Sequence, residues 1–342
     1  MTPRTSVQLP RSSRSSLRAR SAADLVHAVL RRLSPRDWQI IRFLHAHRVL
    51  TTQHICDALF PSPRTAEMRL LDLYQLRVVD RFRPFTRNGS APYHWILDEV
   101  GAQLIAWDRG KDLKQLGWRR ERALGIAASP QLGHRLGVNG FFCALLRAAR
   151  QTPGCRLTQW RSRLTVSGSS CFVEPDAYAV WQEAGWRLPF FLEYDCGTER
   201  LERLSEKMER YRESVAGLDR RNCELWGEPY ANLVLFVLPG ALREANSRRV
   251  LQDNPWVRVA TAIEAPGWRG VTPAAAIWAP VGGTTSGMRR LVDLGDAWRR
   301  QGTTAATTAE EGSEAGDGDE EAGADDPWSE SEAYAGAGEA GA

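Results

Sequence analysis

The residues best suited to chemistry in this sequence are three carboxylates close together in the expected fold. Asp176 follows Pro175 where an expected strand over 171–181 resumes after an interruption at 174–176, and Glu193 and Asp195 lie near the end of the next strand. Residues two apart on a strand share one face of a sheet. If the two strands are adjacent and antiparallel, the carboxylates converge, and a hard cation such as Mg²⁺ neutralises such a cluster. A divalent ion there can activate water and stabilise charge on a phosphodiester.

A cation is expected beside these carboxylates. A helix is expected over 198–216, and Lys207 lies about 80° around it from its buried stripe. The long side chain can therefore reach the sheet edge and hold a water or a phosphate. The predicted catalytic residues are Asp176, Glu193, Asp195 and Lys207. The first three are the predicted ligands of Mg²⁺, the expected cofactor.

The region 131–300, which must position these residues, has the pattern of an α/β domain. A helix is expected over 132–150, and two more over 198–216 and 242–251. Strands are expected over 156–166, 171–181, 187–194, 232–238 and 257–263. The run Asn232–Leu238 is almost entirely apolar, which is typical of a strand buried on both faces. This order predicts a mixed sheet flanked by helices.

The region 33–108 has a different rhythm. Ser34 is a suitable N-cap, Pro35 suits the first helical position, and Asp37 lies in the first turn. Further helices are expected near 51–60, 64–77 and 98–107. Asn88-Gly89 between two β-like runs is a strong hairpin signal. The pattern predicts a winged helix-turn-helix domain, so the expected fold class is α+β.

A winged helix usually presents its third helix to the major groove and its wing to the backbone or minor groove. Arginine pairs bidentately with guanine or phosphate. The predicted DNA-binding residues are Arg64, Thr65, Arg69 and Gln75 on the third helix, and Arg81, Arg83 and Arg87 on the wing. The alternative is a winged helix that binds protein.

The chain is strongly basic apart from its end. Twelve of the 41 acidic residues follow Arg300, where no Lys or Arg occurs, so the first 300 residues hold 45 basic and 29 acidic side chains. Such a balance indicates a polyanionic partner, here double-stranded DNA. We expect 1–32 to be a basic disordered arm in which only Ala22–Leu30 could be helical. We expect 109–130 to be a polar connector and 301–342 an acidic disordered tail.

Other classes of function find little support. No apolar stretch approaches 18 residues, so no membrane span is expected. The N-terminus lacks the apolar region of a secretory signal. The six cysteines form no C-x-x-C pair, which favours the reducing cytoplasm. No P-loop or G-x-G-x-x-G pattern occurs. His134 is expected to be a polar or packing residue, and Tyr211 a core residue.

The spacing Pro175-Asp176 … Glu193-x-Asp195 resembles the PD-(D/E)xK nuclease core, whose element order is αβββαβ. The region 34–265 resembles the replication-relaxation family of actinobacterial plasmid and genome proteins. The shared features are the run Gly89–Trp95, the His134 helix, the step Pro175-Asp176-Ala177 and the stretch FFLEYDCGTERLERLSEKMERY. The resemblance implies a role in plasmid replication and DNA relaxation, with replication or conjugation proteins as partners and no implied oligomeric state.

One departure from the nuclease pattern matters. That pattern ends its third-strand motif in Lys, whereas this chain has Asp195. Lysines moved onto the following helix occur in the nuclease superfamily, and Lys207 would be such a case. The alternative is a nuclease fold without catalysis that only binds DNA, with Glu193 and Asp195 as caps of the next helix. A transcriptional regulator whose second domain senses or dimerises is a third interpretation.

Overall fold

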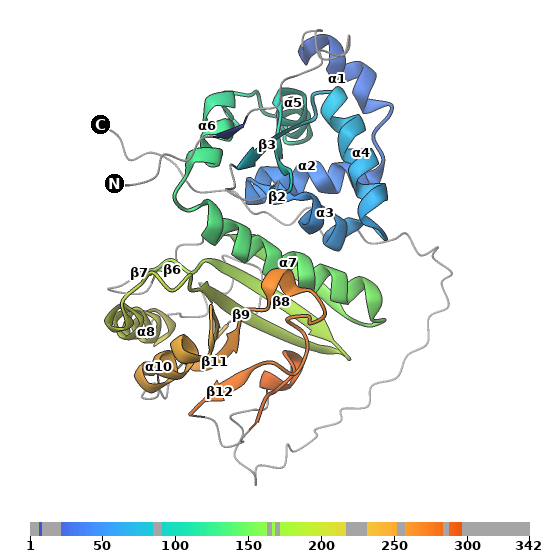
Figure 1. The fold of residues 1–342 in the computed structure, drawn as a ribbon. Helices are drawn as coiled ribbons and strands as arrows, with labels where there is room; N and C mark the ends of the chain where they lie inside the picture. Colours follow the sequence, from blue (N-terminus) through green and yellow to red (C-terminus); the bar gives the residue numbers. More distant parts are fainter. Residues whose placement is uncertain are drawn as a thin grey trace, which may run out of the picture.

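The computed structural model describes residues 7–8, 22–84, 91–162, 166–167, 172–216, 231–251, 257–282 and 287–295. They form an α+β structure with a four-stranded antiparallel sheet, a six-stranded mixed sheet and a short two-stranded sheet (Figure 1). The four-stranded sheet and the helices packed with it come from the N-terminal half of the chain. The large sheet comes from the C-terminal half.

The helices and hairpin strands expected in the N-terminal half are present. The helices are α1 (Ala22–Leu30), α2 (Pro35–His47), α3 (Thr52–Leu59), α4 (Pro63–Gln75) and α5 (Glu99–Asp108). The strands are β1 (Val7–Gln8), β2 (Leu50–Thr51), β3 (Val79–Pro84) and β4 (His94–Leu97). Ser34 and Asp37 form a capping box at the start of α2, which is the chemistry that the sequence predicts.

The expected arm contains a helix in the one stretch where the sequence allows it, and it also contributes a strand that the sequence does not predict. Residues 22–30 form α1, and Leu25 and Val29 are buried in the same core as the other helices. Burial of these two side chains offsets the entropy of ordering a short helix. Further upstream, β1 pairs with β3, with Val7 opposite Pro84. The rest of the arm and the expected tail lie outside the described residues.

The expected polar connector is also folded against the hairpin. It contains α6 (Arg120–Gly125) and a 3-10 turn (Ile126–Ala128). The guanidinium of Arg120 donates to Asp98 at 2.6 Å and to Asp80 at 2.7 Å. These two buried carboxylates are far apart in sequence, so only the folded hairpin creates the site that Arg120 fills.

The large sheet has the strand order β12-β11-β10-β9-β8-β5. The helix α7 (Leu132–Gln151) precedes it, and the strands are β5 (Arg156–Ser162), β8 (Ala177–Glu183), β9 (Trp186–Tyr194), β10 (Leu233–Leu238), β11 (Arg258–Ile263) and β12 (Ala279–Val281). Strands β9, β10 and β11 are parallel, whereas β5, β8 and β12 pair antiparallel with their neighbours. The short pair β6 (Val166–Ser167) and β7 (Phe172–Val173) stands apart, so β5 ends earlier than the sequence predicts.

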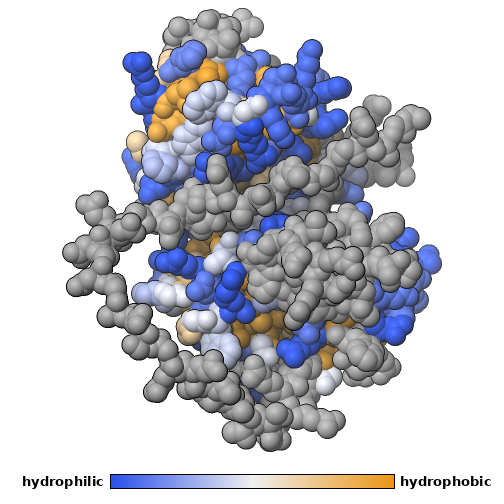
Figure 2. All heavy atoms as spheres, turned by 180° about the vertical axis from the view of Figure 1, so that it is seen from behind, coloured by the Kyte–Doolittle hydropathy of each residue, from blue (hydrophilic) through white to orange (hydrophobic). Residues whose placement is uncertain are grey.

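Helices cover both faces of this sheet (Figure 1). On one face, Phe141 and Phe142 of α7 pack near Phe190 of β9. On the other face, α8 (Leu201–Ala216) and α10 (Ala241–Leu251) cover a second apolar cluster, which includes Tyr211 and Phe236. Within the described residues, no helix is long and apolar enough to cross a membrane. Where the view from behind shows described residues, they are mostly hydrophilic, with smaller apolar areas (Figure 2).

The two halves share one hydrophobic core, because α7 lies between them (Figure 1). The buried amide of Asn139 on α7 donates to the main-chain carbonyls of Val49 at 2.7 Å and His47 at 3.2 Å. The imidazole of His47 stacks on Trp160 of β5 with the ring centroids 3.4 Å apart. Its Nδ1 lies 2.9 Å from the Ser162 hydroxyl.

Burial of His47 predicts a loss of stability in acid. Burial and the charge of His45 lower the pKa of His47 to about 3. The unfolded chain therefore takes up a proton below pH 6.5, whereas the folded chain does not. The free energy of unfolding should fall between pH 7 and pH 5 by about 2 kcal/mol more in the parent than in His47→Phe.

Urea unfolding at both pH values measures this difference. His45 and His54 also have lowered pKa values, about 4 and about 3, so they add to the slope of parent and variant alike. Equal slopes in the two proteins would contradict the prediction.

Candidate functional site

The sheet register brings two of the predicted carboxylates together. Ala177 of β8 pairs with Leu192 of β9 in antiparallel register. Asp176 and Glu193 are the next residues beyond this pair, so they lie opposite each other where β8 begins and β9 ends. The main-chain N–H of Tyr194 donates to Asp176 Oδ2 at 2.8 Å, which fixes this arrangement.

Glu193 is a buried carboxylate with two donors from α8. Lys207 Nζ forms an ion pair with Oε2, and the Tyr211 hydroxyl donates to Oε1 at 2.5 Å. Burial raises the pKa of Glu193 to about 7, and the charge of Asp176 adds to this, although Lys207 and Tyr211 act in the opposite direction. Burial tends to lower the pKa of Lys207, but the two carboxylates outweigh it and the pKa is raised. Lys207 therefore keeps its charge beside Glu193.

Asp176 is held from the other side of the sheet. His134, in the first turn of α7, places Nε2 2.8 Å from Asp176 Oδ1. Burial opposes ionisation of Asp176, but its bond with His134 and the nearby positive charges lower its pKa. The same hydrogen bond raises the pKa of His134. Both oxygens of Asp176 thus have a donor, one from α7 and one from β9.

Asp195 makes its contacts away from this pair. Arg243 of α10 donates through Nε to Oδ2 at 2.6 Å, and the main-chain N–H of Gly197 donates to Oδ1 at 2.6 Å. Arg243 also donates to the main-chain carbonyl of Glu199. Asp195 therefore orders the loop between β9 and α8, which agrees with the alternative interpretation of this residue as a structural one.

Two carboxylates therefore remain as candidate ligands of a cation. Among the described residues, no group of three or more His, Cys, Asp or Glu side chains could hold a metal ion. Mg²⁺ is often held by one or two carboxylates, and substrate phosphates and waters complete its shell. The oxygen donors of Asp176 and Glu193 fit this pattern. Burial raises the pKa of Glu193, and a divalent cation beside the two carboxylates would offset the cost of burying their negative charge.

Sequence reasoning missed three residues at the site. His134 contacts Asp176, Tyr211 contacts Glu193, and Arg243 contacts Asp195. His134 is expected from its position to be a polar or packing residue, and its only sequence signal is its place in the family resemblance. Tyr211 is buried as expected, but its hydroxyl has a polar partner that helical periodicity does not indicate. Arg243 lies on a separate helix with no motif around it.

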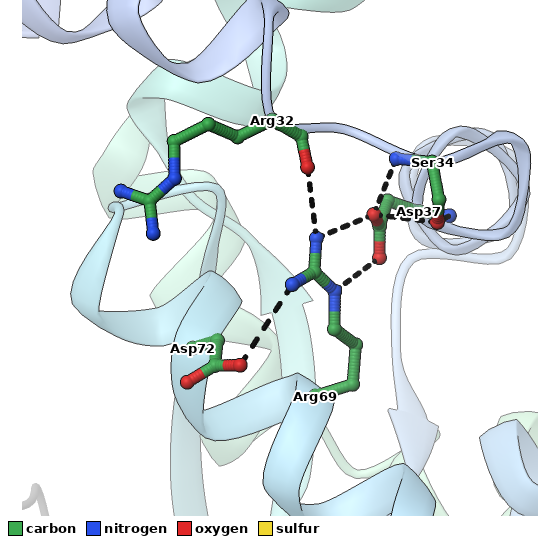
Figure 3. Close-up of polar contacts among 5 residues, drawn as sticks. All are labelled: Arg32, Ser34, Asp37, Arg69 and Asp72. Carbon is green, nitrogen blue, oxygen red and sulfur yellow. Dashed lines mark hydrogen bonds and ion pairs between the residues drawn. The ribbon is translucent and has the colours of Figure 1, made fainter.

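The predicted third-helix residues fall into two groups. Arg64 and Thr65 are exposed at the start of α4, and Gln75 is half-buried at its end. Arg69 instead points into the domain (Figure 3). It donates to both oxygens of the fully buried Asp37, at 2.7 and 2.6 Å, and to the main-chain carbonyl of Arg32. The guanidinium donors of Arg69 therefore hold α4 against α2.

The predicted wing arginines stack on aromatic rings. The guanidinium carbon of Arg81 lies 4.0 Å from the centroid of Tyr93, and that of Arg83 lies 3.7 Å from it. Arg81 also lies over Tyr74 and Trp95. Such stacking holds a guanidinium by its face and leaves the in-plane donors to other partners. Arg87 lies outside the described residues.

A comparison with protein families identifies the group to which this protein is related. The family described as replication-relaxation matches residues 41–224. The chain belongs to the replication-relaxation family. The matched range runs from α2 past the end of α8, so it includes His134, Asp176, Glu193 and Lys207. Arg243 lies beyond it.

The family description connects the chain with replication and relaxation. No curated protein and no solved structure matches the chain. The family thus gives the theme of the function, and the chemistry must be argued from the site.

The contacts of Arg69 predict that its substitution lowers the stability of the fold, whatever its effect on DNA binding. Arg69→Ala leaves the buried carboxylate of Asp37 without its cation, so the free energy of unfolding should fall by about 3 kcal/mol. Arg64→Ala is the matched control, because Arg64 is exposed on the same helix. It should change stability by less than about 0.5 kcal/mol. Thermal unfolding of both variants tests this, and an unchanged melting temperature for Arg69→Ala would refute it.

Proposed function

We propose that this protein binds double-stranded DNA in replication and cleaves one strand with a divalent cation, which relaxes supercoiled DNA. The observation that carries the proposal is the convergence of Asp176 and Glu193 at one sheet edge, with Lys207 in contact with Glu193. An acidic pair beside a partly buried lysine suits phosphodiester hydrolysis.

The element order supports a PD-(D/E)xK nuclease-like core in the region 132–263. Apart from the short pair β6 and β7, the order is a helix, three antiparallel strands (β5, β8 and β9), a helix and a strand parallel to the third, as in the αβββαβ order of those nucleases. Asp176 immediately precedes the second of these strands, and Glu193 lies near the end of the third. Lys207 takes the place of the cation from the following helix.

The residues have distinct roles in the proposed reaction. Asp176 and Glu193 would hold Mg²⁺, which supplies electrostatic stabilisation of the charge on the phosphodiester. Lys207 holds a positive charge next to Glu193 and can orient the attacking water or the scissile phosphate. Tyr211 fixes the second oxygen of Glu193 from the same helix. Asp195 and Arg243 order the adjoining loop.

The N-terminal half would locate the DNA as a winged helix-turn-helix domain. Its third helix, α4, exposes Arg64 and Thr65 at one end. Its hairpin carries Arg81 and Arg83, whose stacking on Tyr93 orders two long side chains before any DNA arrives. Ordering in advance reduces the entropy cost of binding.

A second candidate is a non-catalytic DNA-binding factor with the same fold. One observation favours it: each of the three predicted carboxylates already has a positively charged or hydrogen-bonding partner from the chain. Asp176 has His134, Glu193 has Lys207, and Asp195 has Arg243. A site neutralised in this way is stable without a metal ion.

Conversion of supercoiled plasmid in Mg²⁺ or Mn²⁺ separates the two candidates. The parent should yield nicked or relaxed plasmid, and Asp176→Asn and Glu193→Gln should reduce the rate by at least about 10²-fold, because each removes a charge that holds the cation. Glu206→Gln is the matched control, since Glu206 is exposed next to Lys207 on α8. It should nick as the parent does. If all four proteins bind DNA and none nicks it, the second candidate is correct.

DNA affinity measured against salt tests the proposed interface separately. Binding should weaken steeply as salt rises, and Arg83→Gln should lower the slope of log K against log salt by about one unit. Arg249→Gln removes the same charge from α10, on the far side of the large sheet, and should leave the slope unchanged. Equal slopes for the two variants would remove the wing from the interface.

A further inference from the structure

His134 stands apart from the other residues of the site because it comes from a different layer. It lies at the start of α7, on the face of the sheet opposite α8. Its Nε2 is 2.8 Å from Asp176 Oδ1, and its side chain is about one-third exposed. Glu193 is therefore oriented from α8, and Asp176 from α7.

The approach of α7 to this edge depends on Gly137, one turn after His134. A Cβ atom at position 137 would lie 2.2 Å from the ring of Tyr194. The ring therefore packs directly against the helix backbone, and it meets the imidazole of His134 edge-on with centroids 6.0 Å apart. Tyr194 is also the residue whose N–H donates to Asp176 Oδ2. The close packing of Tyr194 against Gly137 therefore fixes α7 relative to β9. It thereby also places the two groups that donate to Asp176, His134 Nε2 and the main-chain N–H of Tyr194.

The second nitrogen of His134 has its own neighbour. Cys196 Sγ lies 3.8 Å from Nδ1. A thiol that donates to Nδ1 leaves the proton of a neutral imidazole on Nε2, where Asp176 can accept it. The local contacts therefore support the tautomer that donates to the carboxylate.

We propose that His134 is a positioning residue of the cation site, which holds the Asp176 carboxylate in the orientation required to bind a divalent ion together with Glu193. The inference rests on the proposed function. Carboxylates that bind metals are themselves held by hydrogen bonds, and loss of such a partner typically weakens metal affinity by about 10- to 100-fold.

The test uses two amide substitutions that differ in reach. The amide nitrogen of His134→Gln can take the place of Nε2, whereas that of His134→Asn can take only the place of Nδ1. Mn²⁺ binding to the full chain is measured by electron paramagnetic resonance in the absence of DNA. The Kd of His134→Asn should rise by about tenfold or more, and that of His134→Gln should stay within about threefold of the parent.

Two further measurements separate positioning from a general structural effect. The melting temperature of His134→Gln, which keeps a donor to Asp176, should match that of the parent, and the DNA affinity in EDTA should be the same in both variants and the parent. In the nicking assay, His134→Asn should need more Mg²⁺ for half-maximal rate and should approach the parent at saturation.

The outcomes are distinguishable. If the parent binds Mn²⁺ and His134→Asn binds it equally well, the inference about His134 is wrong and the proposed function stands. If the parent neither binds Mn²⁺ nor nicks DNA, both are wrong. If both variants lose affinity and melt at a lower temperature, His134 is a folding residue and not a positioning residue.

Discussion

The rest of the structure depends on the packing of α7 between the two halves of the chain. Its buried Asn139 donates to main-chain carbonyls at the end of α2 and just after it, while His134 on the same helix contacts Asp176 of the large sheet region. A buried amide with fixed partners costs little, but the same amide without them would be expensive, so the pairing strongly favours one arrangement. The N-terminal half and the candidate site are therefore parts of one packed body.

Charge balance explains the form of the site. Burial penalises each carboxylate, and the chain places one compensating group beside each of them from a different helix: α7 for Asp176, α8 for Glu193 and α10 for Asp195. The compensation of Glu193 is incomplete, since its pKa is raised to about 7. A divalent cation, if the proposed function is correct, would offset this remaining cost of burying the negative charge of Glu193.

Local signals in the sequence were sufficient for most elements. Ser34 caps the helix that its position predicts, and β8 and β9 overlap the ranges 171–181 and 187–194 in which strands are expected. The signals fail where a segment gains its order from distant partners. Arg120 ties α6 to Asp80 and Asp98, and Leu25 and Val29 of α1 are buried in the core. Short-range patterns do not contain these contacts.

The sequence by itself determined the candidate carboxylates and the helix that supplies Lys207, because strand alternation and helical periodicity fix which face each side chain takes. Tertiary structure alone decided the partners. It paired Asp195 with Arg243 rather than with Glu193, and it gave Arg69 to Asp37 rather than to the surface. It also brought His134 to Asp176, although 42 residues separate them in the chain. Periodicity in the sequence specifies the face of a helix or strand on which a side chain lies. The partner of that side chain also depends on the register and packing of another element.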